Sequence, residues 1–437
     1  MMNKPLSIEG ELEILQRESY RYFKHETNPE NGLVIDKTAP GWPCSIAAVG
    51  LALTGYPVAI AHDFISRADA VKIVLTTLRF FWNSPHGPED DATGYRGFYY
   101  HFLDMQSGRR AWNCELSTID TALFLAGALT CGEYFDADNA DELEIRTLSR
   151  ALYDRADWQW AMAGDEMVSM GWTPESGFLS YQWTGYDEAL LLYILGLGSY
   201  TFPLPAASYA NWTTGYRWEH IYGQSYLFSA PLFTHQLSHI WIDFRGIQDA
   251  YMQDKGIDYF ENSRRATLVQ QKYAMHNPHG FVGYGEYCWG FTASDGPGPE
   301  VTHINGVKRT FYDYVARGAP HGIDDGTISP WVAVASLPFA PDIVLPTINH
   351  FVHQIGLKAN NAYGFKSTFN PTYQTNAHNV YGWMSPWHFA INEGPILLMV
   401  ENYRTGLVWD LMRKNPFIVQ GLKRAGFDGG WLEACTT

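Results

Sequence analysis

Apolar residues recur along most of the chain at the i, i+3, i+4 spacing that marks one face of an α-helix. The stretch EGELEILQRESYRYFKHE is an early example, whereas strand-like alternation of apolar and polar residues is scarce. The spacing predicts about a dozen helices, over residues 9–26, 44–55, 65–84, 114–135, 139–160, 186–199, 236–254, 260–276, 330–337, 342–357, 395–412 and 416–425.

The loops between these helices are long and rich in Gly, Pro and aromatic residues, as in GYRGFYYHF and GYGEYCWGFTASDGPGP. No 20–50-residue repeat, Ser/Pro-rich linker or charge run divides the chain. We therefore expect one all-α domain over residues 1–437, closed as an (α/α)6 barrel, which is a toroid of helical hairpins. Long loops on a rigid helical scaffold commonly carry the binding site.

The charge balance narrows the class of ligand. The chain has 30 basic and 46 acidic residues and a formal net charge of −16, which disfavours nucleic acid, anionic membranes and polyanionic substrates. A neutral ligand fits better. Aromatic residues make up 15% of the chain and include 16 Trp, and such rings can stack on the flat faces of sugars, although most of them are expected in the core.

Five widely spaced cysteines without a C-x-x-C pair predict free thiols rather than disulfides or a zinc site. The first residues have no apolar leader-like run, and no stretch of 18 apolar residues occurs. We therefore expect a cytoplasmic protein without a membrane partner, or a periplasmic one if a leader has been removed. The oligomeric state is left open.

Neither a metal nor an organic cofactor is expected from the motifs. His235 and His239 in THQLSHIW have the i, i+4 spacing of a helical metal pair, but Gln236 stands where a zinc protease has its Glu. No third ligand is nearby, so a core or ligand-facing role is favoured for both histidines. GFVGYGEY is not followed by a predicted helix, which excludes a dinucleotide-binding loop.

Three acidic residues lie where helices are predicted to begin. Glu115 follows a candidate N-cap, Asn113, and Glu188 begins the apolar helix of WTGYDEALLLYILGLGS. Glu393 immediately precedes Gly394 and Pro395, and proline is favoured at the first helical position. In a closed ring of helical hairpins, the N-termini of the inner helices would bring all three acids to one mouth.

Paired carboxylates suit glycosidic cleavage, which needs one protonated and one ionised group. Glu188 is the predicted proton donor, because Trp183 and Tyr186 can desolvate it and oppose the helix dipole that favours its ionised form. Its neighbour Asp187 either raises the pKa of Glu188 as a like charge or only caps the helix.

Three acids are candidates for the ionised partner of Glu188. They are Glu115, Asp120 and Glu393. Each acid of the set has a competing explanation as a helix-capping or solvated residue.

Seven motifs, in order between residues 96 and 409, resemble those of one known family: RGFYYHFLD, ELSTIDTALFLAG, WTGYDEALLLYILGLGS, HQLSHIWIDFRG, WGFTASDGPGP, DDGTISPWVAVASLPF and GPILLMVENYRTGLVW. This is the bacterial glycoamylase-like family, whose characterised members are β-1,2-glucanases of glycoside hydrolase family 144. The related module of cyclic β-1,2-glucan synthases shares much of the pattern. The resemblance implies an (α/α)6 barrel and metal-free, acid-dependent cleavage of neutral glucans.

The resemblance also implies roles for individual residues. The Glu of the family's G-Y-N-E-A motif falls on Glu188 as proton donor, and the acids of E-x-S-T-I-D fall on Glu115 and Asp120 in the same cleft. Because this second motif is intact, Glu115 ranks first among the candidates for the ionised partner. The chain departs from the family at Asp187, where Asn is usual. It departs again at AINEGP, where many members read A-I-D-Q-G-P, so that the acid lies at position 393 instead of 392.

We therefore expect a glycoside hydrolase acting on β-1,2-linked glucan or related β-gluco-oligosaccharides. A transglycosylase on the same glucans and a non-catalytic glycan-binding protein are the alternatives, since the departures touch the rim of the site. A polysaccharide lyase is disfavoured by the negative charge. Polar and aromatic motif residues are expected to line or support the cleft, unless their role is structural: Arg96, Tyr99, Trp183, Tyr186, Asp187, His235, His239, Trp241, Arg245, Trp289, Asp295 and Trp383.

Overall fold

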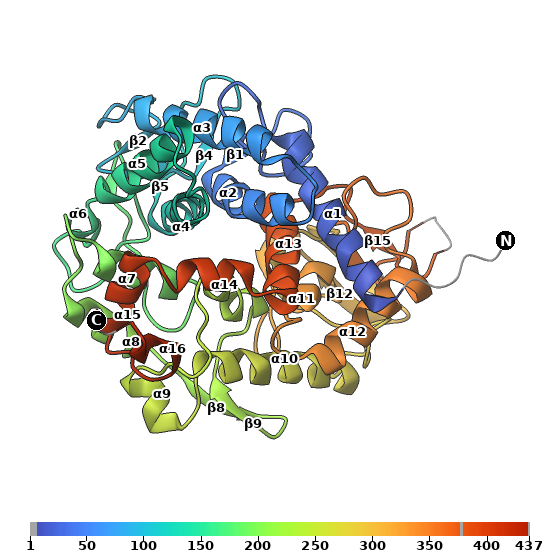
Figure 1. Cartoon of the computed structure of the whole chain (residues 1–437). Helices are drawn as coiled ribbons and strands as arrows, with labels where there is room; N and C mark the ends of the chain where they lie inside the picture. The colour runs from blue at the N-terminus through green and yellow to red at the C-terminus, as the bar shows by residue number, and fades with distance from the viewer. Residues whose placement is uncertain (1–6, 376–378, 436–437) are drawn as a thin grey trace. The chain divides into compact units, whose positions relative to one another are not determined.

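The computed structural model describes residues 7–375 and 379–435, and helices make up most of its regular structure (Figure 1). Strands are present but short, with two to five residues each. The chain forms two compact units, each assembled from three separated segments. Unit 1 comprises Met1–Tyr22, Trp218–Leu237 and Glu261–Arg404, and unit 2 comprises Phe23–Arg217, Ser238–Phe260 and Thr405–Thr437. The predominantly helical class is as expected, and the single domain over residues 1–437 stays a prediction.

Unit 2 contains most of the helices in the first half of the chain. These are α2 (Ile46–Ala61), α3 (Arg67–Asn83), α4 (Thr118–Tyr134), α5 (Ala140–Asp154), α6 (Trp158–Ala161), α7 (Leu190–Gly198), α8 (Ala206–Thr213), α9 (Ala250–Lys255), α14 (Leu407–Met412), α15 (Pro416–Arg424) and α16 (Gly430–Glu433). Its strands are β1 (Cys44–Ser45), β2 (Gly94–Tyr95), β3 (Phe98–Tyr100), β4 (Phe102–Leu103), β5 (Leu116–Ser117), β6 (Gly171–Thr173) and β7 (Gly177–Phe178).

The core of unit 2 centres on α2 and α4, which lie side by side (Figure 1). A Cβ atom at Gly127 would lie 2.2 Å from the carbonyl oxygen of Gly50, so this close approach requires glycine. Both helices are buried over most of their surface, as is α7, whereas α3 and α5 bury one face only. Helices that are apolar all round therefore pack against amphipathic ones, with α5 on α4 and α15 on α7.

The strands of unit 2 connect the helices at their N-terminal ends. Strands β2, β3, β5, β6 and β7 form one antiparallel sheet in the order β2-β3-β5-β6-β7, and β1 pairs with β4. Strand β5 leads directly into α4, and β1 leads directly into α2. Side chains on and beside these strands therefore lie next to the helix N-termini.

Unit 1 contains a smaller set of helices and several hairpins. Its helices are α1 (Ile8–Glu26), α10 (Tyr259–His276), α11 (Pro330–Ala335), α12 (Pro341–Asn349) and α13 (Ala390–Arg404), with α1 and α10 each crossing a unit boundary by a few residues. Helix α11 packs against α13 and α12. Its strands are β8 (Trp218–Ile221), β9 (Gln224–Leu227), β10 (Ala293–Ser294), β11 (Glu300–Ile304), β12 (Val307–Phe311), β13 (Val315–Ala316), β14 (Phe369–Asn370) and β15 (Trp383–Met384).

Several predicted helices are shorter or interrupted. The helix predicted over residues 236–254 is wrong, since a 3-10 helix at Leu237–Ile240 is followed by loop and then by α9. Within that loop the Asp243 carboxylate accepts a hydrogen bond from the backbone N–H of Arg245, a local contact that competes with helix. The helix predicted over 395–412 divides at Gly406, where φ is +75°, into α13 and α14. The end of 342–357 is a π-helix, His350–Ile355.

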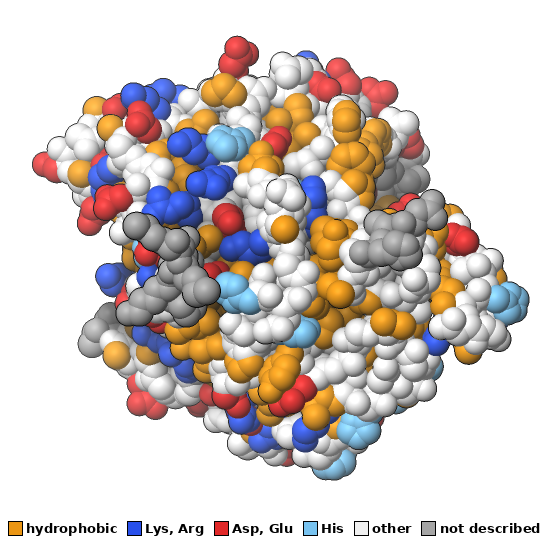
Figure 2. All heavy atoms as spheres, turned by 90° about the vertical axis from the view of Figure 1, so that its right-hand side faces the viewer, with side chains coloured by type: hydrophobic (Ala, Val, Ile, Leu, Met, Phe, Trp, Pro, Cys, Tyr) orange, Lys and Arg blue, Asp and Glu red, His pale blue; other side chains and the backbone are white. Residues whose placement is uncertain are grey.

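The surface carries both signs of charge. On the face drawn in Figure 2, basic side chains lie among acidic and hydrophobic ones. None of the helices described here is both long and apolar enough to span a lipid bilayer. All five cysteines are free thiols, and three of them, Cys44, Cys131 and Cys288, are buried.

Candidate active site

The register of β3 and β5 brings a histidine opposite an acid. Tyr100 pairs with Leu116, so the next residue pair is His101 and Glu115, and the backbone N–H of His101 donates to the Glu115 carbonyl over 2.9 Å. Directly opposed residues of an antiparallel pair project on the same side of the sheet. Accordingly, His101 Nδ1 lies 2.8 Å from Glu115 Oε1.

A second acid reaches the same imidazole from the first turn of α4. Ser117 caps this helix: its Oγ accepts from the Asp120 N–H and donates to Asp120 Oδ2. Asp120 Oδ2 lies 3.6 Å from His101 Nε2. The predicted cap at Asn113 is therefore wrong. Glu115 does not lie in the helix, because strand β5 separates it from α4.

These groups hold opposite charges together. Burial alone would lower the pKa of His101, but the carboxylates of Asp120, Glu115 and Asp36 raise it to about 9. Burial acts to raise the pKa of Glu115, yet the hydrogen bond and charge of His101 outweigh it and lower the pKa. Near neutral pH, His101 is therefore positively charged and Glu115 negatively charged.

A third carboxyl group faces this cluster. The Asp36 carboxylate accepts a hydrogen bond of 3.1 Å from Trp42 Nε1. Burial raises the pKa of Asp36 to about 6, although the positive charge of His101 opposes the change. An isolated antiparallel bridge between Ile35 and Cys44 sets the position of Asp36 next to β1.

Glu188 lies in the turn immediately before α7, which begins at Leu190 and not at 186 as predicted. Ser238 fixes this turn: its Oγ donates to the Glu188 carbonyl and accepts from the Leu191 N–H. Burial raises the pKa of the Glu188 carboxyl to about 7, and the negative charge of Asp120 acts in the same direction. With this pKa, Glu188 is protonated in a substantial fraction of molecules near neutral pH.

The aromatic residues expected around Glu188 are largely buried. Trp183 donates its Nε1–H to Thr118 Oγ1 over 3.0 Å, and the Tyr186 ring stacks on Tyr259 with centroids 5.9 Å apart. Tyr259 in turn donates its hydroxyl to Asp249 over 2.8 Å. These contacts hold the residues before α7 in a rigid, weakly polar environment.

Asp187 makes the cap-like contact that the sequence offered as one of two alternatives. Its Oδ1 accepts from the Ala189 N–H at 3.0 Å, a cap-like contact, and from Trp212 Nε1 at 3.3 Å. Burial and the neighbouring charge of Glu188 raise its pKa well above the ordinary value.

Glu393 belongs to unit 1 and lies in the first turn of α13, although the helix begins at Ala390 rather than at Pro395. Its carboxylate is buried and has two partners: Ser19 Oγ at 2.7 Å and His388 Nδ1 at 3.0 Å. Burial raises its pKa against the effect of His388. These partners favour a structural role, and convergence of Glu393 with the acids of unit 2 stays a prediction.

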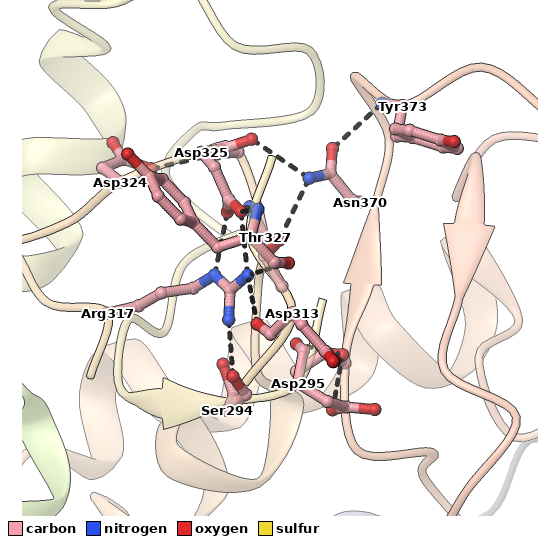
Figure 3. A network of polar contacts seen from close by, with 12 residues as sticks. Ser294, Asp295, Asp313, Arg317, Asp324, Asp325, Thr327, Asn370 and Tyr373 are labelled. Carbon is pink, nitrogen blue, oxygen red and sulfur yellow. Dashed lines mark hydrogen bonds and ion pairs between the residues drawn. The ribbon is translucent and has the colours of Figure 1, made fainter. Parts of the chain in front are cut away.

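A buried polar network orders another predicted motif of unit 1 (Figure 3). Arg317 binds Asp325 through two hydrogen bonds of 2.8 and 2.9 Å and also donates to backbone carbonyls, including that of Ser294. The Asp295 carboxylate accepts hydrogen bonds from Ser and Thr hydroxyls of the segment 367–385. The carboxylates of Asp325 and Asp295 are occupied by protein donors, which favours a structural role for Asp295.

Three aromatic residues expected near substrate are fully buried, and each uses its polar atom inside the protein. Tyr99 donates its hydroxyl to the Phe81 carbonyl, Trp241 its Nε1–H to Thr54, and Trp289 its Nε1–H to Thr347. These bonds fit the structural alternative.

Two predicted arginines also have protein partners. Arg245 binds Asp243 through two hydrogen bonds and lies over the ring of Trp409, which fits the structural alternative. Arg96, half exposed, lies 3.6 Å from Asp157. Trp383 is partly exposed in β15 and pairs with Asn370.

The two histidines considered as a metal pair do not share an α-helix. His235 and His239 lie in separate 3-10 helices, Leu232–His235 and Leu237–Ile240, and in different units. Burial lowers the pKa of His235 to about 4, and its ring contacts the Ser229 carbonyl. Within residues 7–375 and 379–435, no three His, Cys, Asp or Glu side chains are grouped as metal ligands would be.

Comparison with known proteins decides the family. A glycoamylase family model, described as "Putative glucoamylase", matches residues 180–416, which is more than half of the 437-residue chain. The chain belongs to the glycoamylase family. The match contains Glu188 and Glu393, whereas the β5–α4 segment with Glu115 and Asp120 precedes it.

Relatives of this glycoamylase-family chain are known in sequence and structure. A curated relative from Parabacteroides distasonis, an "exo beta-1,2-glucooligosaccharide sophorohydrolase (non-reducing end)", is 25% identical over 450 residues; the match covers 96% of this chain and 58% of the relative. A "putative glucoamylase" structure from Bacteroides uniformis is 29% identical with a TM-score of 0.86, covering 98% of this chain and 100% of that one. An endo-β-1,2-glucanase structure from Chitinophaga pinensis is 24% identical with a TM-score of 0.82, and the match covers 98% of this chain and 100% of that one. At this identity the likeness shows only the fold.

The sequence did not single out two members of the cluster, His101 and Asp36. His101 lies within the quoted RGFYYHFLD motif, but a single histidine beside aromatic residues is typical of a buried core position. Its position opposite Glu115 depends on the pairing of β3 with β5, which comprises only two residue pairs. Such short strands show no recognisable alternation of apolar and polar residues in the sequence. Asp36 lies in a loop without any recognisable signal.

Replacing His101 with Gln is expected to change how the stability of this glycoamylase-family protein depends on pH. The folded pKa of about 9 exceeds the ordinary 6.5, so the ion pairs favour folding fully below pH 6.5, and the effect disappears as pH rises through 9. The wild type should lose on the order of 3 kcal/mol of unfolding free energy from this group over that interval.

Urea unfolding of both proteins between pH 6 and 9.5 measures the difference. The variant should lose most of that pH dependence, whereas substitution of the exposed His279 by Gln should leave it unchanged. Equal pH dependence in wild type and His101→Gln would contradict the charged state of His101.

Proposed function

We propose that the chain is a glycoside hydrolase that cleaves β-1,2-linked glucan or related β-gluco-oligosaccharides. The observation that carries the proposal is the arrangement of acids in unit 2. Burial raises the pKa of Glu188 to about 7, with a smaller contribution from the charge of Asp120. Asp120 and Glu115 both contact the imidazole of His101. The substrate class is taken from the names of the relatives. Since the chain spans 58% of the curated relative, the activity of that longer protein is an inference here.

In this mechanism Glu188 is the general acid. It donates its proton to the glycosidic oxygen while the bond from that oxygen to C1 breaks. The Glu188 carboxyl lies before the first helical residue of α7, and burial supplies most of the rise in its pKa. A group with a pKa near 7 can both hold and release a proton near neutral pH.

Asp120 is the ionised partner in this proposal. The sequence ranked Glu115 first, but Glu115 makes a hydrogen bond of 2.8 Å with His101, and Asp120 is the acid whose charge acts on Glu188. Asp120 then either takes a proton from the attacking water or attacks C1 itself, and the two routes release different anomers. His101 positions both acids and stabilises their negative charge.

We also propose the (α/α)6 barrel as the closed form of the helical fold. Helices that are apolar on all sides, such as α2, α4 and α7, pack against amphipathic ones such as α3 and α5. That alternation is expected of an inner and an outer ring.

The experiment is to incubate the purified chain with linear β-1,2-glucan and separate the products by chromatography. We expect short β-1,2-gluco-oligosaccharides from this glucan and no release from β-1,3-glucan, cellulose or starch. Products longer than the starting glucan would favour the transglycosylase. Binding without any product would favour the glycan-binding protein, and glucose released from starch would contradict the proposed linkage.

A further inference from the structure

A series of aromatic rings leads from the acid cluster of unit 2 to the solvent. His101 stacks on Phe102 with ring centroids 4.0 Å apart, and Phe102 lies 5.1 Å from Trp112. Trp112 meets Trp42 edge to face at 4.8 Å, and Trp42 donates to Asp36. Trp112 is 56% exposed, so a large apolar ring stands in water beside charged groups.

The backbone holds this ring in a conformation that its residue type disfavours. Trp112 and Asn113 both have positive φ, +56° and +50°, and the Cys114 N–H donates to the Ala111 carbonyl. These are the central residues of a type I′ turn, which prefers Asn, Asp or Gly at both places. A bulky residue at positive φ is an outlier, and such strain commonly accompanies a functional role.

A buried arginine fixes the turn from below. Arg110 donates from Nε to the Cys114 carbonyl at 2.6 Å and from Nη2 to the Asn113 carbonyl at 2.8 Å. The same guanidinium pairs with Glu175 at 2.6 Å, although its side chain is only 2% exposed. The turn is therefore held rigidly, which excludes local flexibility as the reason for the exposed tryptophan.

We propose that Trp112 is a stacking platform for a glucosyl unit of the substrate. Its subsite lies away from the glycosidic bond that Glu188 and Asp120 cleave. A pyranose ring presents a flat face of C–H groups that packs on an aromatic ring, while its hydroxyls remain in water. The ring series joins Trp112 to His101, so the platform lies on the solvent side of the acid cluster. The platform rests on the proposed function, because it assigns a place to part of that substrate.

Two substitutions test the platform, so that the test does not depend on whether one variant folds. Trp112→Ala removes the ring, and Trp112→Asn removes it while placing a residue that the turn prefers, so this variant should melt at a higher temperature than wild type. Both should reduce kcat/KM on longer β-1,2-gluco-oligosaccharides by about tenfold or more, mainly through KM. Trp112→Phe should retain most of the activity.

The matched control is Tyr200→Ala, since Tyr200 is 54% exposed and follows the far end of α7 from Glu188. This variant should behave as wild type over a series of oligosaccharide lengths. Normal turnover by wild type together with unchanged KM in Trp112→Ala and Trp112→Asn would overturn the platform and leave the proposed function standing. Oligosaccharide binding is also followed by the change in tryptophan fluorescence. If wild type binds without turnover, and Trp112→Asn abolishes this change, the platform stands and the proposed hydrolysis fails.

Discussion

Replacing Glu188 with Gln should slow the cleavage of β-1,2-glucan by about 10²–10⁴-fold, the usual contribution of a general acid. Gln keeps the shape of the side chain and removes the proton that the leaving oxygen requires. Because the backbone contacts of Glu188 run through its carbonyl and Ser238, the turn before α7 should survive the change. Glucan binding should therefore persist.

The pH profile gives a second test of the same residue. Wild-type turnover should fall as pH rises through about 7, because deprotonation of Glu188 removes the acid. Glu188→Gln should lose this basic limb and recover partly on an aryl glucoside whose leaving group needs no proton. Near-normal turnover of glucan by Glu188→Gln would contradict the assignment.

Glu133→Gln is the matched control for this substitution. Glu133 is a half-buried acid in the last turn of α4, and burial raises its pKa also. Its carboxylate accepts a hydrogen bond from Asn415. This variant should be active, which separates loss of a buried acid from loss of the proton donor.

Asp120→Asn should cause the next largest loss, again about 10²–10⁴-fold, because Asn can neither activate water nor attack C1. Asn can still accept from Ser117, so the N-terminus of α4 should persist. Removal of this charge should also lower the pKa of His101, which Asp120 raises, and that of Glu188. An NMR titration of His101 and the pH profile measure the two shifts.

Glu115→Gln distinguishes the two candidates for the ionised partner. Since Glu115 acts through its hydrogen bond to His101, its substitution should cost less activity than Asp120→Asn. A larger loss in Glu115→Gln than in Asp120→Asn would reverse the assignment and restore the ranking made from the sequence.

Long periodic segments were predictable from the sequence. The helices expected over 9–26, 65–84 and 260–276 appear as α1, α3 and α10 with boundaries shifted by one or two residues. The helix predicted over 236–254 was wrong although the apolar spacing is present. A buried aspartate, Asp243, accepts a local backbone hydrogen bond there, and short turns replace the helix. Local side-chain hydrogen bonds of this kind leave no periodic signal.

The sequence singled out most of the acids of the candidate site, and their roles stay a prediction, but it did not show how the acids are arranged. Glu188 stands beside a helix N-terminus as inferred, but Asp120 lies in the first turn of α4 and Glu115 lies before β5, because a two-residue strand separates Glu115 from the helix. The charge of His101 depends on three acids from separate segments, which only folding brings together. For the same reason, the sequence could not distinguish an exposed tryptophan such as Trp112 from a buried one such as Trp241.

The glycine contact between α2 and α4 makes the position of Asp120 depend on the middle of its helix. Gly127 lies about 10 Å along α4 from Asp120, and there the backbones of the two helices approach each other without an intervening side chain. A single methyl group at this contact would force the helix axes apart and tilt α4, while His101 stays fixed by its strand. The distance between acid and imidazole is thus set by steric exclusion at a point that no substrate reaches, and the reaction geometry is open to disturbance from the protein interior.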